Sequence, residues 1–123
     1  WNKGAFALYT AVMLSAEKYG FTRVLRERLP KSQAGTVEKI DAALNQLPSL
    51  SGRYIGEMEQ VAETYAGIGI PAEFHEGAAE IFRMLNKTSL GTERRETIDP
   101  DRDPLDLLAK ILIELDFQQK NKQ

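Results

Sequence analysis

The chain has 123 residues, of which 42% are hydrophobic and 28% charged, and its formal net charge is −2 at pH 7. This length fits one hydrophobic core, and the charge gives no field that would attract a phosphate backbone, so we expect no nucleic-acid partner. The absence of cysteine excludes disulfides and thiolate sites, and the absence of a membrane-length apolar run or a signal peptide predicts a soluble cytoplasmic protein with no membrane partner.

Helical patterning begins within a few residues of Trp1, which indicates a chain cut from a longer one. Over Gly4–Tyr19 apolar residues occupy most faces of a helix and predict a central element buried on most sides. They are Phe6, Leu8, Tyr9, Val12, Met13, Leu14 and Ala16. Gly20 can stop this helix in a left-handed conformation, and Thr22 can cap a short second helix that ends near Leu29–Pro30.

Three amphipathic helices are predicted next. The third helix ends before Pro48 and has an apolar stripe of Val37, Ile40, Leu44 and Leu47. The fourth ends at the Gly67–Pro71 turn and has a stripe of Tyr54, Met58, Val61, Tyr65 and Ile68. The fifth runs from about Ala72 to Asn86, with an expected inner face of Phe74, Ala78, Ile81 and Leu85.

The stretch Thr88–Asp103 is polar and has no apolar period, which predicts an exposed loop. Asp103 should then cap a last helix that has Pro104 at its first position. The expected inner stripe of this helix is Leu105, Leu108, Leu112 and Leu115. We expect the tail Gln118–Gln123 to fray, and no segment alternates as a strand does, so the predicted fold is all-α, a single domain of about six helices.

Few motifs point to chemistry. Gly67 and Gly69 do not make a dinucleotide fingerprint, because no strand precedes them and the third glycine is missing. His75 has no cysteine partner and no His-Glu-x-x-His pattern around it, so we interpret it as a structural or surface histidine. No metal site is predicted.

Glu57 is more informative, because it stands three residues after Tyr54 and four before Val61, at the border of an apolar stripe. A carboxylate there must pair, face a cavity or reach water at the rim, so both a site residue and a rim glutamate remain open. Lys3, in the first turn of the first helix, can extend its ammonium group to solvent.

Several blocks of the sequence resemble the helical C-terminal domain of 6-phosphogluconate dehydrogenase-like and β-hydroxyacid dehydrogenase-like NAD(P)-dependent oxidoreductases, in a branch with a short C-terminal domain. The blocks are Trp1–Gly4, Ala16–Gly20, Gly52–Ala62, Gly69–Pro71 and Phe74–Ala79. The resemblance covers residues 1–85, and Gly56–Glu59 is its most specific part. It implies a dehydrogenase-like domain at 1–87. The residue pattern adds an exposed loop at 88–103 and a terminal amphipathic helix at 104–123, which we expect to pack on the same domain.

In that superfamily a Rossmann domain binds NAD or NADP, and the helical domain closes over a small hydroxy-acid or sugar-acid substrate and builds a homodimer interface. The resemblance places the catalytic lysine upstream of Lys3, outside this chain. The chain alone is therefore expected to be inactive, to bind no cofactor by itself and to contain no catalytic residue.

The resemblance assigns three substrate-side positions. Glu57 falls near the acidic residue of a Lys-Asp pair that lines the active site of β-hydroxyacid dehydrogenases, and Lys3 falls near the cleft. Asn2 falls where 6-phosphogluconate dehydrogenases have a catalytic glutamate, a departure that argues against phosphogluconate itself. The expected substrate-binding residues are Glu57, Lys3 and Asn2.

Two alternatives remain open. A stand-alone helical interaction or oligomerisation module would explain the missing lysine and the strongly apolar last helix. An unrelated helical bundle that binds a small ligand between its helices is the other.

Overall fold

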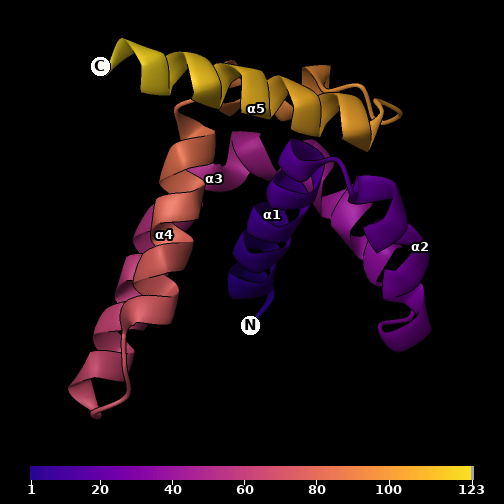
Figure 1. Ribbon diagram of the computed structural model, residues 1–123. Coiled ribbons are helices and arrows are strands. Elements are labelled where there is room, and N and C mark those ends of the chain that lie inside the picture. Colours follow the sequence, from indigo (N-terminus) through magenta and orange to yellow (C-terminus); the bar gives the residue numbers. More distant parts are fainter. Residues whose placement is uncertain (123) are drawn as a thin grey trace.

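The computed structural model describes residues 1–122. Within this range the chain forms five α-helices, two short 3-10 turns and no strand, so the all-α prediction is confirmed (Figure 1). The elements are α1 (Asn2–Tyr19), α2 (Thr22–Ser32), α3 (Thr36–Gly67), α4 (Glu73–Asn86), η1 (Ser89–Thr92), η2 (Arg95–Thr97) and α5 (Pro104–Asn121).

The long helix α3 and the shorter α4 pack along each other as a hairpin and share the most extensive helix–helix contact. α1 packs against all four other α-helices, and α5 lies across one end of the assembly (Figure 1). The core forms where these elements meet. Its most deeply buried large side chains are Met13, Leu44, Leu47, Phe82, Leu85, Leu108 and Ile111.

The third and fourth predicted helices are one helix, because Pro48 lies inside α3 and does not end it. An interior proline removes one backbone hydrogen bond and costs about 3 kcal/mol relative to alanine. The buried face of α3 continues on both sides of Pro48 and offsets this cost. It consists of Ile40, Leu44, Leu47, Ser51, Tyr54, Met58 and Ala62.

The boundary between α1 and α2 differs from the prediction in one detail. Gly20 has a φ of 77° and ends α1 in the left-handed conformation, as predicted. Thr22 does not cap α2, because it is already the first helical residue, and its hydroxyl donates to the Glu17 carboxylate at 2.7 Å. α2 also continues past Pro30 and ends at Ser32.

Arg26 fastens α2 to α3. Its guanidinium group makes two hydrogen bonds of 2.7 Å to the Asp41 carboxylate, and both side chains are about three-quarters buried. The hydrogen bond to Asp41 raises the pKa of Arg26 further above its ordinary value, so the arginine stays charged at any pH at which the protein is folded.

Two helices differ from the prediction in which of their faces are buried. Leu8 and Val12 on the outer face of α1 are exposed, so the prediction that this helix is buried on most sides is wrong for that face. On α4, Phe74 is 59% exposed while the neighbouring His75 is buried, because Ala78, Phe82 and Leu85 fix a face that His75 shares.

The segment between α4 and α5 contains the turns η1 and η2 and buries Leu90, which the sequence did not indicate. Asp103 caps α5 as predicted, accepting a hydrogen bond of 2.8 Å from the Leu105 amide. The inner face of α5 is centred on Leu107, Leu108 and Ile111, and Leu105 is 39% exposed. The helix continues to Asn121, so most of the tail expected to fray is helical; Gln123 lies outside the described residues.

Candidate functional site

The N-terminal turn of α1 lies against both α3 and α4 and brings together residues that are distant in the sequence. Gly4 makes this approach possible, because a Cβ atom at this position would lie 3.3 Å from the Phe74 ring and 3.6 Å from His75 Nε2. The close packing places the preceding residue, Lys3, beside the middle of α3.

The structure brings two of the predicted site residues, Lys3 and Glu57, into direct contact. The Lys3 ammonium group donates a hydrogen bond to the Glu57 carboxylate across 54 positions of sequence. The two side chains are 35% and 36% exposed, so water and small solutes reach the pair. Lys3 therefore does not simply extend to solvent, and Glu57 is not a rim carboxylate that faces only water.

Two further residues, Arg53 and Tyr54, complete this cluster. Lys3 Nζ lies 4.9 Å from the centre of the Tyr54 ring, and Arg53 Cζ lies 5.3 Å from the same ring centre, both within the range of a cation–π contact. Arg53 Nε is 3.6 Å from Glu57 Oε1, and its side chain is 67% exposed. The ring itself is buried and packs edge-on against Phe82 at 5.4 Å.

We call Lys3, Arg53, Tyr54 and Glu57 the Lys3 cluster. Two cations and one carboxylate give it a local charge of +1, which suits a singly charged anion. The guanidinium group of Arg53 presents parallel N–H donors that match a carboxylate, and much of it faces solvent. The arrangement is able to bind and orient an organic anion, with the Glu57 carboxylate as a hydrogen-bond acceptor beside it.

Asn2, the third predicted site residue, is exposed at the first position of α1, next to Lys3. Sequence reasoning did not identify Arg53 or Tyr54 as site residues. Arg53 could have been identified from the sequence, because it stands four residues before Glu57 and residues at this spacing lie on the same side of a helix. The packing of α1 against α3, which brings Lys3 to Arg53 and Glu57, could not be predicted from the sequence.

His75 is buried, in agreement with its interpretation as a structural residue. Its ring packs edge-on against Tyr65 at 4.7 Å and Phe74 at 5.2 Å. Among the described residues no group lies within hydrogen-bonding distance of its Nδ1 atom. The aromatic contacts and the neighbouring Gly4 give this histidine a packing role against the first turn of α1.

A second surface feature is a shallow acidic hollow of about 490 Å³ between α3 and α4. Its lining is Glu59, Glu73, Glu76, Gly77, Ala79, Glu80 and Arg83. Arg83 makes a 2.6 Å ion pair with Glu59 and a second one with Glu80. The ion pair with Glu59 links α4 to α3 at the surface, and we assign the hollow this structural role. Within residues 1–122 no group of three or more His, Cys, Asp or Glu side chains is arranged to hold a metal ion.

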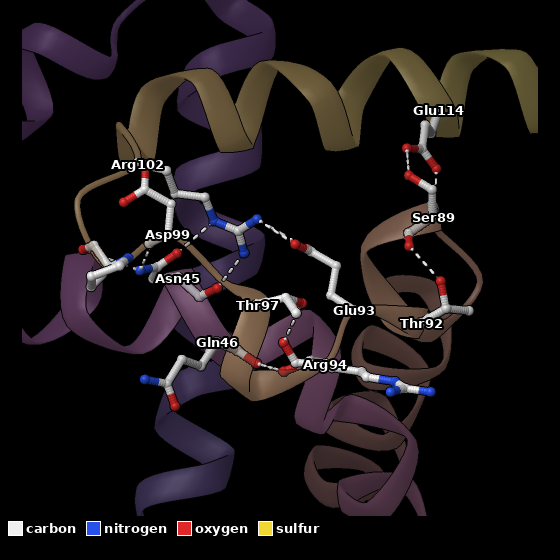
Figure 2. A network of polar contacts seen from close by, with 12 residues as sticks. Asn45, Gln46, Ser89, Thr92, Glu93, Arg94, Thr97, Asp99, Arg102 and Glu114 are labelled. Carbon is white, nitrogen blue, oxygen red and sulfur yellow. Dashed lines mark hydrogen bonds and ion pairs between the residues drawn. The ribbon is translucent and has the colours of Figure 1, made fainter.

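Arg102 is the centre of a third polar network, between α3 and the segment that precedes α5 (Figure 2). Its Nε donates to the Asn45 side chain at 2.5 Å, its Nη1 donates to Glu93 at 2.9 and 3.0 Å, and its Nη2 donates to the Asn45 carbonyl. Asn45 in turn donates to the carbonyls of Asp99 and Pro100. These bonds fasten the segment before α5 to α3, which is a structural role.

Comparisons with known proteins give one family. A model described as "Domain of unknown function (DUF1932)" matches residues 16–85, more than half of the chain. Glu57 and Arg53 lie inside the matched part, whereas Lys3 and α5 lie outside it. No curated protein and no solved structure matches the chain. No helix within residues 1–122 is long and apolar enough to cross a membrane.

Proposed function

The chain belongs to the DUF1932 family of domains, and we propose that it is the substrate-side domain of an NAD(P)-dependent dehydrogenase that acts on small hydroxy acids or sugar acids. The observation that carries the proposal is the contact between Lys3 and Glu57. The resemblance in the sequence assigns these two residues to a substrate cleft separately, and the fold brings them into one half-exposed cluster.

The role of each residue follows from its position. Arg53 binds the carboxylate of the substrate, since its donors face solvent at the edge of the cluster. Tyr54 provides a buried flat surface beneath both cations. Glu57 holds Lys3 and Arg53 in place and accepts a hydrogen bond from a substrate hydroxyl. Asn2, beside Lys3, offers an amide to the same ligand.

The described residues do not fit the dinucleotide itself. Residues 1–122 contain no strand, and Gly67 and Gly69 lie at a turn between α3 and α4 rather than between a strand and a helix. In this proposal a separate dinucleotide-binding domain therefore supplies NAD or NADP, and this chain supplies contacts to the substrate and excludes water from it.

A titration of the isotope-labelled chain, followed by NMR, tests the proposal. We expect 3-hydroxypropanoate and gluconate to shift the amide signals of Lys3, Arg53 and Glu57, with a Kd in the millimolar range, about −4 kcal/mol for half of a site. The neutral analogue 1,3-propanediol and NAD⁺ should cause no shift at these residues. Arg53→Gln should abolish the response.

The chain offers a matched control in Arg23→Gln, because Arg23 pairs with Glu27 at the same spacing on α2, outside the Lys3 cluster. Equal effects of the two substitutions, or shifts spread over all basic residues, would contradict a specific site. The proposed dehydrogenase activity is tested in the native protein, which should reduce NAD(P)⁺ to NAD(P)H when it is given a hydroxy acid that binds in the titration. Binding without any such turnover would leave an anion-binding domain and refute the dehydrogenase.

The alternative of a helical interaction module is favoured by a different observation, the exposed apolar face of α1. The two functions are compatible, because the Lys3 cluster lies on the side of α1 that faces α3, while the apolar face points away from the rest of the chain.

A further inference from the structure

The outer side of α5 is apolar at its centre and basic at both ends. Ile113 and Phe117, one helical turn apart, are 70% and 65% exposed. Lys110 lies one turn before Ile113 and Lys120 one turn after Phe117, and both lysines are exposed. We call these four residues the α5 face. Figure 1 shows α5 lying across one end of the assembly, and within residues 1–122 no other α-helix covers its outer side.

The fold is built on the opposite side of α5. Leu107, Leu108 and Ile111 are buried there and hold the helix on the rest of the chain. Single exposed apolar residues are common on protein surfaces, but Ile113 and Phe117 are two large side chains next to each other on one helix face. The described residues leave them largely uncovered, although burying them would be favourable.

The charges in the C-terminal half of α5 are sorted by sign between its two sides. Glu114 accepts hydrogen bonds from η1, and Asp116 pairs with Lys18 at 2.9 Å, so both carboxylates are used inside the chain. Among the described residues neither Lys110 nor Lys120 has an ion-pair partner. The outer side therefore presents uncompensated positive charge, although the chain as a whole has a net charge of −2.

One carboxylate, Asp106, is exposed on the same side of α5. It lies in the first turn of the helix, where a negative charge stabilises the positive end of the helix dipole. Asp106 is also outside the α5 face, because Lys110 separates it from the apolar centre. Two lysines and one aspartate leave this side of the helix with a charge of +1.

The spacing of the α5 face indicates the shape of its partner. Its members follow one another at intervals of three, four and three residues, the spacing by which one helix packs along another. A lipid surface would take up only the two apolar side chains, because the larger apolar side of α5 is buried in the fold. A second copy of the α5 face would bring lysine against lysine, which is repulsive.

We propose that the α5 face binds an acidic amphipathic helix of another protein. The apolar side chains of that helix pack on Ile113 and Phe117, and its flanking carboxylates pair with Lys110 and Lys120. α5 lies outside residues 16–85, the part of the chain that matches the family model. The inference is independent of the dehydrogenase proposal, because the Lys3 cluster belongs to α1 and α3.

Two synthetic helical peptides of about the length of α5 test the proposal. The first has leucine at heptad positions a and d and glutamate at e and g, and the second has lysine in place of glutamate. In fluorescence anisotropy with the full 123-residue chain, the glutamate peptide should bind at least about tenfold more tightly than the lysine peptide. Added salt should weaken the complex with the glutamate peptide.

Reversal of charge identifies the surface that binds. Lys110→Glu combined with Lys120→Glu should exchange the preference, so that the lysine peptide binds more tightly. Lys31→Glu combined with Lys39→Glu is the matched control, because it changes the net charge equally at two exposed lysines of α2 and α3, and it should keep the original preference. Phe117→Ser should weaken binding of the glutamate peptide by about tenfold or more with an unchanged helical circular dichroism spectrum.

Three results would overturn the proposal. The first is no binding of the glutamate peptide, or equal effects of the two double substitutions. The second is binding of the chain to vesicles of phosphatidylcholine and phosphatidylglycerol in equal parts that Phe117→Ser abolishes, which would assign the α5 face to a membrane. The third is a lower mass of the chain in light scattering after Phe117→Ser, which would assign it to a second copy. None of these results affects the NMR titration, so the two proposals fail separately.

Discussion

Arg53 and Arg102 are the centres of two polar regions that use the same side chain in opposite ways. Arg102 is 21% exposed, and its Nε, Nη1 and Nη2 atoms all donate to Asn45 or Glu93 (Figure 2). Arg53 is 67% exposed, rests on the Tyr54 ring and lies 3.6 Å from Glu57. An arginine whose three side-chain nitrogen atoms all donate inside the chain stabilises the fold, whereas one whose donors face solvent retains them for a ligand.

The largest expected difference between the two regions is in stability. Arg102→Ala leaves the Glu93 carboxylate and the Asn45 carbonyl without their shared donor, and hydrogen bonds to charged groups contribute about 1.5–3 kcal/mol. We expect the free energy of unfolding to fall by about 2–3 kcal/mol in urea denaturation. Arg53→Ala should change it by less than about 0.5 kcal/mol, as surface substitutions usually do. Equal losses would mean that the Lys3 cluster is as structural as the Arg102 network.

The sequence predicted the ends of individual helices better than the way in which the helices pack together. The stop at Gly20 and the Asp103 cap with Pro104 are local signals, and the structure confirms both. Pro48 is also a local signal, but the burial of α3 on both sides of it outweighs the lost hydrogen bond. Propensity is a weak prior where a long helix has a continuous buried face.

In the candidate site, too, the sequence identified single residues but not the contacts between them. Lys3 and Glu57 were both identified in the sequence, one from a family resemblance and the other from its place beside an apolar stripe. Their contact depends on the docking of α1 on α3, which no periodicity specifies. The Arg102 network was not predicted at all, because its partners lie 9 and 57 positions away in segments without a pattern.

The second prediction concerns two glycines that approach the same asparagine. A Cβ atom at Gly91 would lie 2.4 Å from the Asn86 carbonyl oxygen, a backbone atom that cannot move without distorting the end of α4. A Cβ atom at Gly52 would lie 2.9 Å from Asn86 Oδ1, at the end of a side chain that can rotate away. Overpacking typically costs 1–3 kcal/mol, so Gly91→Ala should destabilise the chain by about 2 kcal/mol.

Gly52→Ala is the matched substitution and should cost less than about 1 kcal/mol, since exposed alanine also favours the helix over glycine. Thermal unfolding of the two variants side by side is the measurement. If Gly52→Ala proved the more harmful, the Asn86 side chain would have to be held more firmly than the backbone at the end of α4.

The smallest expected effect on stability is at Glu57. Half-exposed ion pairs contribute about 0–1 kcal/mol, so Glu57→Gln should lower the free energy of unfolding by less than about 1 kcal/mol. If the native protein is the dehydrogenase proposed above, the same change removes the acceptor that positions Lys3 and Arg53, and kcat/KM should fall at least tenfold, about 1.4 kcal/mol of transition-state stabilisation. Glu27→Gln breaks a pair of the same spacing on α2 and should leave turnover unchanged. If Glu57→Gln instead lowered the melting temperature strongly and left kcat/KM intact, the pair would serve only to dock α1 on α3. The Lys3 cluster would then belong with Arg102 among the residues that hold the fold.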